Sequence, residues 1–290
     1  MAHSYEPKPI TRRRNADWSP ITLYRYFSPN KLETFLRGRL GLTPPKFLND
    51  PLEFAVSRIP PDRQEAESMF DSFTADEFQM LRQAGQTQLS FDQFKKLKEP
   101  YREPWISRIL SQDYQNENFE YMRENLSQFW GVICLSEFAD NSPMWTHYTK
   151  EYEGFVSEFV CQWEHLSHQP QARALPFGVA FKVEYSQDRP VFNRTFSNAP
   201  ECLCIKETNW SYEHEWRIVR LLASAEIADG GRQFARYPPA SLKRIIVGNR
   251  MSQPMKDDVL TFVKAQPFSH VEVQQAVPNL AKRTIAFEPL

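Results

Sequence analysis

The stretch 210–220, which reads WSYEHEWRIVR, places the tightest limit on how this chain folds. Successive side chains of a β-strand point to opposite faces of a sheet, so residues two apart share a face. On such a strand Glu213, Glu215 and Arg217 lie on one face. The other face carries apolar bulk, above all Trp216. A strand with one charged face is either an exposed edge with an ordinary Glu–Arg pair or the wall of a polar cleft, and the sequence leaves both open.

The composition excludes several classes of protein. With 290 residues, 41% of them hydrophobic, the chain can bury the core of one large domain or two small ones. A net charge of −1 gives no overall basic field for nucleic acid. Nine glycines against 22 prolines, without a glycine-rich phosphate-binding motif, argue against a dinucleotide fold. The four cysteines lack the spacing of a zinc site, so we expect no metal.

Targeting signals and membrane segments are not evident in the sequence. No run of apolar residues has the length of a membrane-spanning helix, and the first residues do not resemble a signal peptide. Few cysteines in a long chain suit reduced thiols. These observations predict a cytoplasmic protein that does not contact a membrane.

The N-terminal part predicts a flexible arm followed by the first strand. Residues 1–18 are polar and contain three consecutive arginines, so we expect a flexible basic arm, and a single domain over 19–290. Residues Ile21–Phe27 alternate as a strand that places Arg25 among apolar neighbours. A guanidinium in such a place is costly unless it is paired or reaches a polar cavity.

The loop 47–53, which reads FLNDPLE, is dense in polar groups and is fixed by Pro51. Its Asn49, Asp50 and Glu53 are either turn and cap residues or part of the wall of a site.

The rest of the chain shows two kinds of sequence pattern, one helical and one strand-like. Residues 59–125 are charged and show helical spacing of phenylalanine and leucine, which predicts a helical insertion that serves either as a lid or as a surface for a partner protein. The apolar run Phe129–Ser136 is typical of a central strand, and further strand-like runs follow it. The order of elements predicts an α+β fold with a mixed sheet.

Four motifs together resemble a bacterial family known only as a domain of unknown function. In chain order they are Leu23–Tyr26 (LYRY), 47–53 (FLNDPLE), Ser136 with 144–148 (MWTHY) and Gly154-Phe155, and 213–217 (EHEWR). The phenylalanine that this family has directly before Asn-Asp-Pro is Phe47 here, with Leu48 inserted.

At a greater distance the same layout is similar to the ADP-ribosyltransferase superfamily, which has an Arg or His on the first strand, a Ser or aromatic residue in the middle and a late Glu-x-Glu. The resemblance implies a mainly antiparallel split β-sheet core with a helical insertion, and NAD as the substrate. It implies Glu215 as the catalytic carboxylate and Glu213 as its helper. The implied NAD-binding residues are Arg25, Tyr26, Ser136, Trp145 and Tyr148, and the implied site wall comprises Asn49, Asp50, Glu53, His147 and Arg217.

These residue types suit that chemistry. Cleavage of the bond between nicotinamide and ribose develops positive charge, which a fixed and desolvated carboxylate stabilises. A second carboxylate orients or deprotonates the acceptor. The guanidinium of Arg25 matches a pyrophosphate, and tyrosine or tryptophan rings stack on flat bases.

We therefore expect an NAD-dependent ADP-ribosyltransferase that modifies a protein or a nucleic acid, in the toxin or phage-defence role that the resemblance implies. Two alternatives stay open. In a non-catalytic binding or sensor module, Arg25 pairs with Glu215 or Asp50 as part of the structure, Trp145 and Tyr148 belong to the core and Ser136 is a cap. In a metal-dependent nuclease, Asp50, Glu53 and Glu215 surround the metal.

Overall fold

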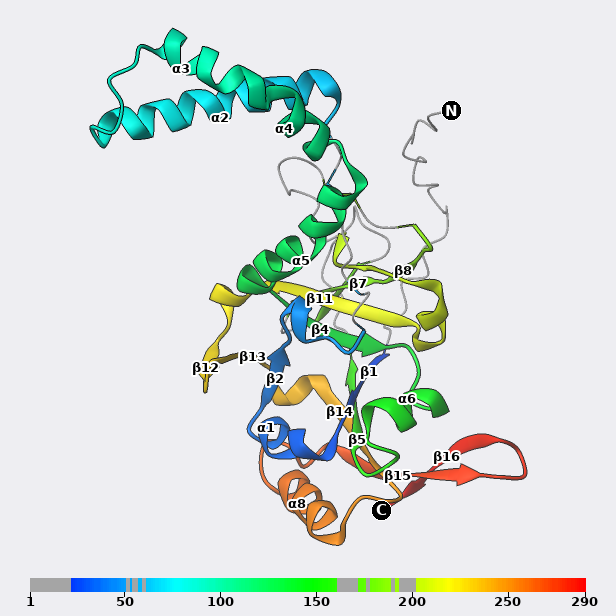
Figure 1. The fold of residues 1–290 in the computed structure, drawn as a ribbon. Coiled ribbons are helices and arrows are strands. Elements are labelled where there is room, and N and C mark those ends of the chain that lie inside the picture. Colours follow the sequence, from blue (N-terminus) through cyan, green and yellow to red (C-terminus); the bar gives the residue numbers. More distant parts are fainter. Residues whose placement is uncertain are drawn as a thin grey trace. The chain divides into compact units, whose positions relative to one another are not determined.

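A computed structural model describes residues 22–50, 53, 57–58, 61–160, 172–175, 178–188, 191–192 and 202–290. The basic arm predicted over 1–18 lies outside these residues. The chain forms two compact units, each assembled from separate segments; Figure 1 follows the elements in chain order. Unit 1 comprises 1–36, 136–181 and 237–290, and unit 2 comprises 37–135 and 182–236. None of the described helices has the length and apolar character that crossing a membrane requires.

Unit 1 is built on a sheet whose strands are mostly antiparallel. Its order is β16 (Thr284–Pro289), β15 (Glu272–Asn279), β14 (Leu242–Gly248), β5 (Phe155–Val160) and β1 (Thr22–Phe27). The exception is the parallel pair β14 and β15, which the helix α8 (Gln253–Lys264) connects. The predicted class, α+β with a mixed and mainly antiparallel sheet, is confirmed.

The alternation predicted for the first strand is present in β1. Leu23 and Phe27 are buried, and Phe27 stacks on Phe155 of the neighbouring strand with ring centroids 4.6 Å apart. After β1 the chain turns into the short helix α1 (Leu32–Leu36), whose Phe35 packs against both of these rings. Leu23 and Phe27, which lie four residues apart on the same face of the strand, therefore anchor the core of unit 1.

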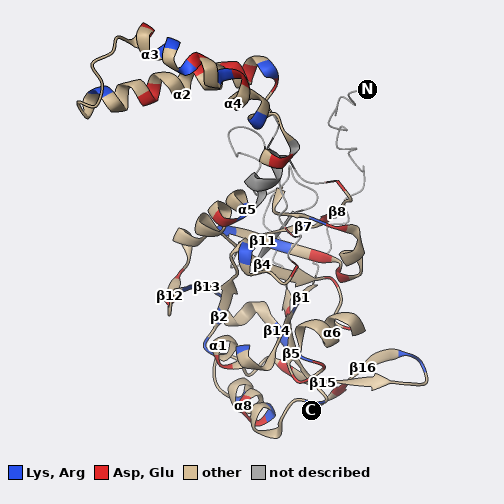
Figure 2. Cartoon of the chain, in the orientation of Figure 1, with Lys and Arg blue, Asp and Glu red and all other residues tan. Residues whose placement is uncertain are grey.

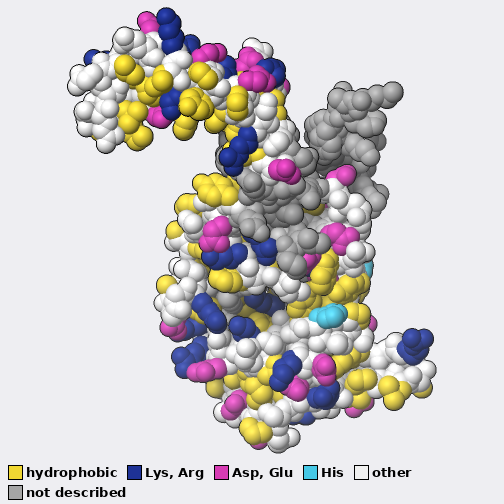
Figure 3. All heavy atoms as spheres, viewed as in Figure 1, with side chains coloured by type: hydrophobic (Ala, Val, Ile, Leu, Met, Phe, Trp, Pro, Cys, Tyr) yellow, Lys and Arg dark blue, Asp and Glu magenta, His cyan; other side chains and the backbone are white. Residues whose placement is uncertain are grey.

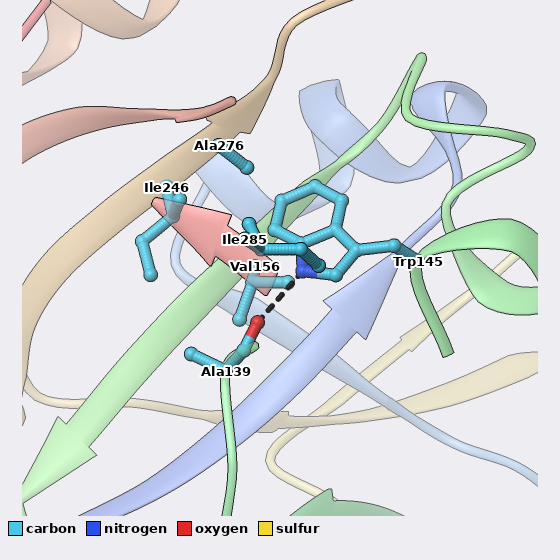
Figure 4. Packing of buried hydrophobic residues seen from close by; sticks show 6 residues of the cluster. All are labelled: Ala139, Trp145, Val156, Ile246, Ala276 and Ile285. Carbon is cyan, nitrogen blue, oxygen red and sulfur yellow. Dashed lines mark hydrogen bonds between the residues drawn. The ribbon is translucent and has the colours of Figure 1, made fainter. Parts of the chain in front are cut away.

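The helix α6 (Ser142–Tyr148) carries the centre of a second cluster of buried residues in unit 1. Asn141 caps its first turn by accepting a hydrogen bond from the Met144 amide. Trp145 is fully buried, and its indole nitrogen donates to the Ala139 carbonyl at 2.7 Å (Figure 4). Residues 150–152 then form a left-handed turn, because all three have positive φ.

Unit 2 contains the buried strand β4 (Trp130–Ser136), whose last residue belongs to unit 1, beside β11 (Glu215–Leu221). The predicted run 129–136 begins as a strand one residue later because Phe129 ends a helix. The remaining strands are short. They are β2 (Arg39–Leu42), β12 (Ile227–Asp229) and β13 (Arg232–Arg236) in one sheet, the parallel pairs β3 (Ser57–Arg58) with β9 (Val191–Phe192) and β8 (Glu184–Tyr185) with β10 (Ile205–Lys206), and the hairpin β6 (Ala172–Leu175) with β7 (Gly178–Lys182), which lies mostly in unit 1.

The helical segment predicted over 59–125 corresponds to four helices of unit 2. They are α2 (Arg63–Gln83), α3 (Phe91–Lys98), α4 (Arg102–Ile109) and α5 (Gln112–Phe129). Capping boxes begin α2 and α3, with Asp62 and Ser90 as the N-cap residues. Apolar side chains such as Phe73 and Met80 are more than half exposed on α2, and Figure 3 shows hydrophobic side chains on the surface of these helices.

Candidate functional site

Six charged side chains of unit 2 lie together, and we call them the buried ionic network. None is more than 7% exposed, although charged side chains are rarely buried so fully. Four are carboxylates and two are cations. The members are Asp50, Glu53, Lys206, Glu213, Glu215 and Arg217. The network therefore contains five residues that the sequence predicts for the site, and Lys206, which it does not.

The two candidate catalytic carboxylates reach the network from different backbone structures. Glu213 is the last residue of a 3-10 helix, Thr208–Glu213, and β11 begins only at Glu215. Between them His214 adopts a left-handed conformation with φ of 45°. The prediction that Glu213 shares a strand with Glu215 is therefore wrong, because the turn at His214 interrupts the extended backbone. The two carboxylates still converge through the turn.

Arg217 holds one side of the network. Its Nε and Nη2 donate to the two oxygens of Glu215 at 2.8 and 2.9 Å, a bidentate pair. Nη2 also donates to Glu53, and Nη1 donates to the Leu203 carbonyl at 2.9 Å. Glu215 and Arg217 lie two apart on β11, as the alternation predicts, and Figure 2 marks acidic and basic residues along this strand.

The guanidinium of Arg217 stays charged despite its complete burial. Burial lowers the pKa of Arg217 to about 9, while the carboxylate of Asp50 acts in the opposite direction. The side chain is therefore protonated at neutral pH. The charged face of the stretch 210–220 is neither an exposed edge nor an open wall, because Glu215 and Arg217 are both buried.

Lys206 holds the other side of the network. Its Nζ donates to Glu213 Oε2 at 2.6 Å and to Glu215 Oε2 at 3.1 Å, and it lies 3.8 Å from Glu53 Oε1. Sequence reasoning missed this lysine because it considered only the spacing of the carboxylates. The available signal was an apolar run, Cys202–Ile205, that ends in a lysine just before the acidic stretch.

Among the residues that the structure describes, the network holds more negative than positive groups. With every member ionised, four carboxylates face two cations, and such an excess is costly away from water. Burial raises the pKa of Glu215; Lys206 opposes this shift and the charge of Glu213 adds to it. Glu215 is therefore a carboxyl group that retains its proton to a higher pH than an exposed glutamate.

Three half-buried aromatic residues border the network. The hydroxyl of Tyr185 accepts a hydrogen bond from the Glu215 amide at 2.8 Å, and burial raises the pKa of this tyrosine. The ring of Trp210 lies 4.8 Å from Lys206 Nζ, a cation–π contact, and 6.1 Å from the ring of Tyr212. None of these aromatic residues was predicted for the site.

The residues predicted to bind NAD belong to unit 1. Arg25 is half-buried on β1, and its guanidinium lies 5.2 Å from the centre of the Phe27 ring. The hydroxyl of Tyr26 donates to the Phe138 carbonyl at 2.9 Å, and its ring meets Trp145 edge to face. Ser136 is fully buried, and its hydroxyl accepts from the Phe138 amide at 3.2 Å.

Two further residues of unit 1 lie on α6, where Tyr148 is half-buried and His147 is exposed. In unit 2 the predicted wall residue Asn49 is exposed, whereas Asp50 beside it is buried. The structure thus gathers the acidic and basic residues of unit 2 into one network. The assignment of the unit 1 residues to NAD binding stays a prediction.

Among the residues that the structure describes, no three histidine, cysteine, aspartate or glutamate side chains are placed to hold a metal ion. The metal-dependent nuclease alternative needs such a group around Asp50, Glu53 and Glu215, and it stays a prediction.

No protein-family model, no curated protein and no solved structure matches this chain. The resemblance to the two families therefore rests on the motifs alone.

Proposed function

We propose that this protein is an NAD-consuming enzyme of the ADP-ribosyltransferase type, which cleaves the bond between nicotinamide and ribose and transfers ADP-ribose to a protein or nucleic-acid acceptor. Glu215 is its catalytic carboxylate and Glu213 is the helper. One observation carries the proposal: both carboxylates, each 2% exposed, converge on the same ammonium group of Lys206.

The charge of the network suits this reaction. The ribose becomes positively charged as nicotinamide departs, and a carboxylate stabilises that charge best when it is already oriented and separated from water. Two oxygens of Glu215 are fixed by Arg217 and one of them also by Lys206. The carboxylate therefore needs little reorganisation during the reaction.

The proposal is tested by the release of nicotinamide from NAD by purified protein. We expect Glu215→Gln, which keeps the shape of the side chain and removes its charge, to lower the rate about a hundredfold or more. Glu158→Gln is the matched control, since Glu158 accepts from Arg244 at 2.6 Å and belongs neither to the network nor to the residues predicted to bind NAD. This control should stay within a few-fold of the wild-type rate.

A wild-type protein that releases no nicotinamide, and whose melting temperature does not rise with millimolar NAD, would contradict the proposal. Equal losses in Glu215→Gln and Glu158→Gln would contradict the assignment of Glu215.

A second candidate function is a non-catalytic binding or sensor module. It is favoured by the observation that the oxygens of Glu215 accept hydrogen bonds from Arg217 and Lys206 inside the unit, as in a structural ion-pair network. In that case Glu215→Gln changes the stability of the protein, and NAD turnover is absent from every variant. The same assay therefore separates the two functions.

A further inference from the structure

Lys206 occupies a place that the proposed chemistry does not by itself explain. Its side chain is 3% exposed, and a buried lysine loses the hydration of its ammonium group. Hydrogen bonds to Glu213 and Glu215, together with the nearby charge of Glu53, compensate for this loss of hydration. From this arrangement we propose that Lys206 is a positioning residue, which holds Glu213 and Glu215 side by side and offsets their negative charge for the reaction. The inference rests on the proposed function.

The backbone fixes where the ammonium group lies. Lys206 is the second residue of β10, which pairs in parallel with β8, so that Lys206 lies opposite Tyr185. Tyr185 in turn accepts the amide hydrogen of Glu215. The ring of Trp210 covers the ammonium group at 4.8 Å from its centroid. Lys206, on β10, and Glu215, at the start of β11, are thus both positioned by Tyr185 of the same short strand pair.

Lys206 and Arg217 bind the carboxylates of the network in different ways. The planar guanidinium of Arg217 binds Glu215 in a bidentate manner and also binds Glu53. The ammonium of Lys206 has three donors and joins Glu213 to Glu215. Glu213 leaves its helix at the turn of His214, so its position relative to Glu215 depends on a contact across that turn.

The loss of Lys206 would change how Glu215 titrates, because Lys206 lowers the raised pKa of this carboxyl group. Two like charges that share a site do not ionise independently, and the pKa of one rises strongly when the cation between them is removed. The titratable and charged groups that face this pair are Asp50, Glu53, Arg217, Tyr185, Tyr212 and Cys134. Among these groups Arg217 supplies a positive charge, but it is already bound by Glu215 and Glu53.

The test uses Lys206→Met, which keeps the length of the side chain without its charge, and Lys206→Arg, which keeps the charge. The pH profile of nicotinamide release is measured for both. We expect the acid limb of the Lys206→Met profile to move upward by about one pH unit or more. Lys206→Arg should stay closer to the wild-type profile. Lys98→Met is the control, because Lys98 binds Glu77 at 2.7 Å on the helices of unit 2, away from the network.

A purely structural lysine would lower the melting temperature of Lys206→Met and leave the pH profile of its remaining activity in place, and this result would overturn the inference. If Lys206→Met does not fold, Lys206→Gln replaces it.

A second measurement separates this inference from the proposed function. The side-chain carboxyl groups of glutamate are labelled with carbon-13 and titrated by NMR in wild type and in Lys206→Met, without NAD. We expect a carboxyl resonance of the variant to titrate at higher pH than in wild type. Identical titrations would overturn the inference whether or not the protein releases nicotinamide. A shifted titration without nicotinamide release would leave the role in ionisation standing and would refute the proposed function.

Discussion

Removal of the guanidinium of Arg217 should destabilise the protein more than any other single change in the buried ionic network. Arg217→Met keeps most of the aliphatic stem but leaves Glu53 and Glu215 with Lys206 as the one remaining cation of the network. It also leaves the Leu203 carbonyl, which accepts from Nη1 at 2.9 Å, without that donor. Breaking a buried ion pair by removing one partner costs roughly 3–5 kcal/mol. The orphaned carbonyl adds about 1–3 kcal/mol.

The total loss of stability is smaller than the sum of these two penalties, because one of the carboxylates can take up a proton. We therefore expect the free energy of unfolding to fall by about 4 kcal/mol at neutral pH. Urea unfolding followed by tryptophan fluorescence measures the loss as a lower midpoint at constant slope. Arg244→Met is the matched control. Arg244 binds Glu158 at 2.5 Å and Gln274 at 2.7 Å, but its side chain is 20% exposed, so the expected loss is about 1 kcal/mol.

A loss in Arg217→Met no larger than the loss in Arg244→Met would refute the reasoning. It would mean that the carboxylates of the network do not depend on Arg217 for their burial. A much smaller loss at acid pH than at neutral pH would support the reasoning, since protonation of the orphaned carboxylates relieves the penalty.

Two further predictions concern pH and backbone space. Burial raises the folded-state pKa of Glu215 above its ordinary value, so the native protein binds more protons than the unfolded chain at a pH between these two values. Wild-type stability therefore falls as pH rises through that range. Glu215→Gln should remove this slope from melting temperatures measured from about pH 4 to pH 8, and an unchanged slope would refute the prediction. A Cβ at Gly248 would overlap the backbone carbonyl of Tyr152, so Gly248→Ala should cost about 2 kcal/mol or more. At Gly41 the nearest atom is 3.9 Å away, in the ring of Phe234, so Gly41→Ala should change the free energy of unfolding by less than about 1 kcal/mol, and equal losses would argue against the overlap.

The sequence predicted the elements that depend on local patterns of side chains. The alternation in 21–27 predicted β1, and the apolar run 129–136 predicted β4, because burial selects side chains at fixed intervals along a strand. The helical spacing over 59–125 likewise corresponds to α2–α5, although the last of these helices continues to Phe129.

The arrangement of the site depended on features that no local pattern reveals. The E-x-E pattern suggested one strand, but the left-handed backbone of His214 ends the 3-10 helix there and separates Glu213 from β11. The position of Lys206 follows from the parallel pairing of β8 with β10, which places Lys206 opposite Tyr185, 21 residues earlier in the sequence. The partnership of Glu53 with Arg217 spans 164 residues. Contacts of this kind depend on the assembled fold rather than on spacing.

The interleaving of the two units along the chain has a consequence for synthesis on the ribosome. The segments of unit 2 end at residue 236, whereas unit 1 also needs 237–290, which supply β14, β15 and β16. Translation proceeds at about 5–20 residues per second, so unit 2 has on the order of 3–10 seconds to fold before the last segment of unit 1 is made. During that interval β1, the first strand among the described residues, already has its partner β5, but β5 still lacks β14 on its other side. The first described strand thus belongs to the unit whose described strands are made last, and the exposed edge of β5 is the surface that a nascent chain must protect from mispairing.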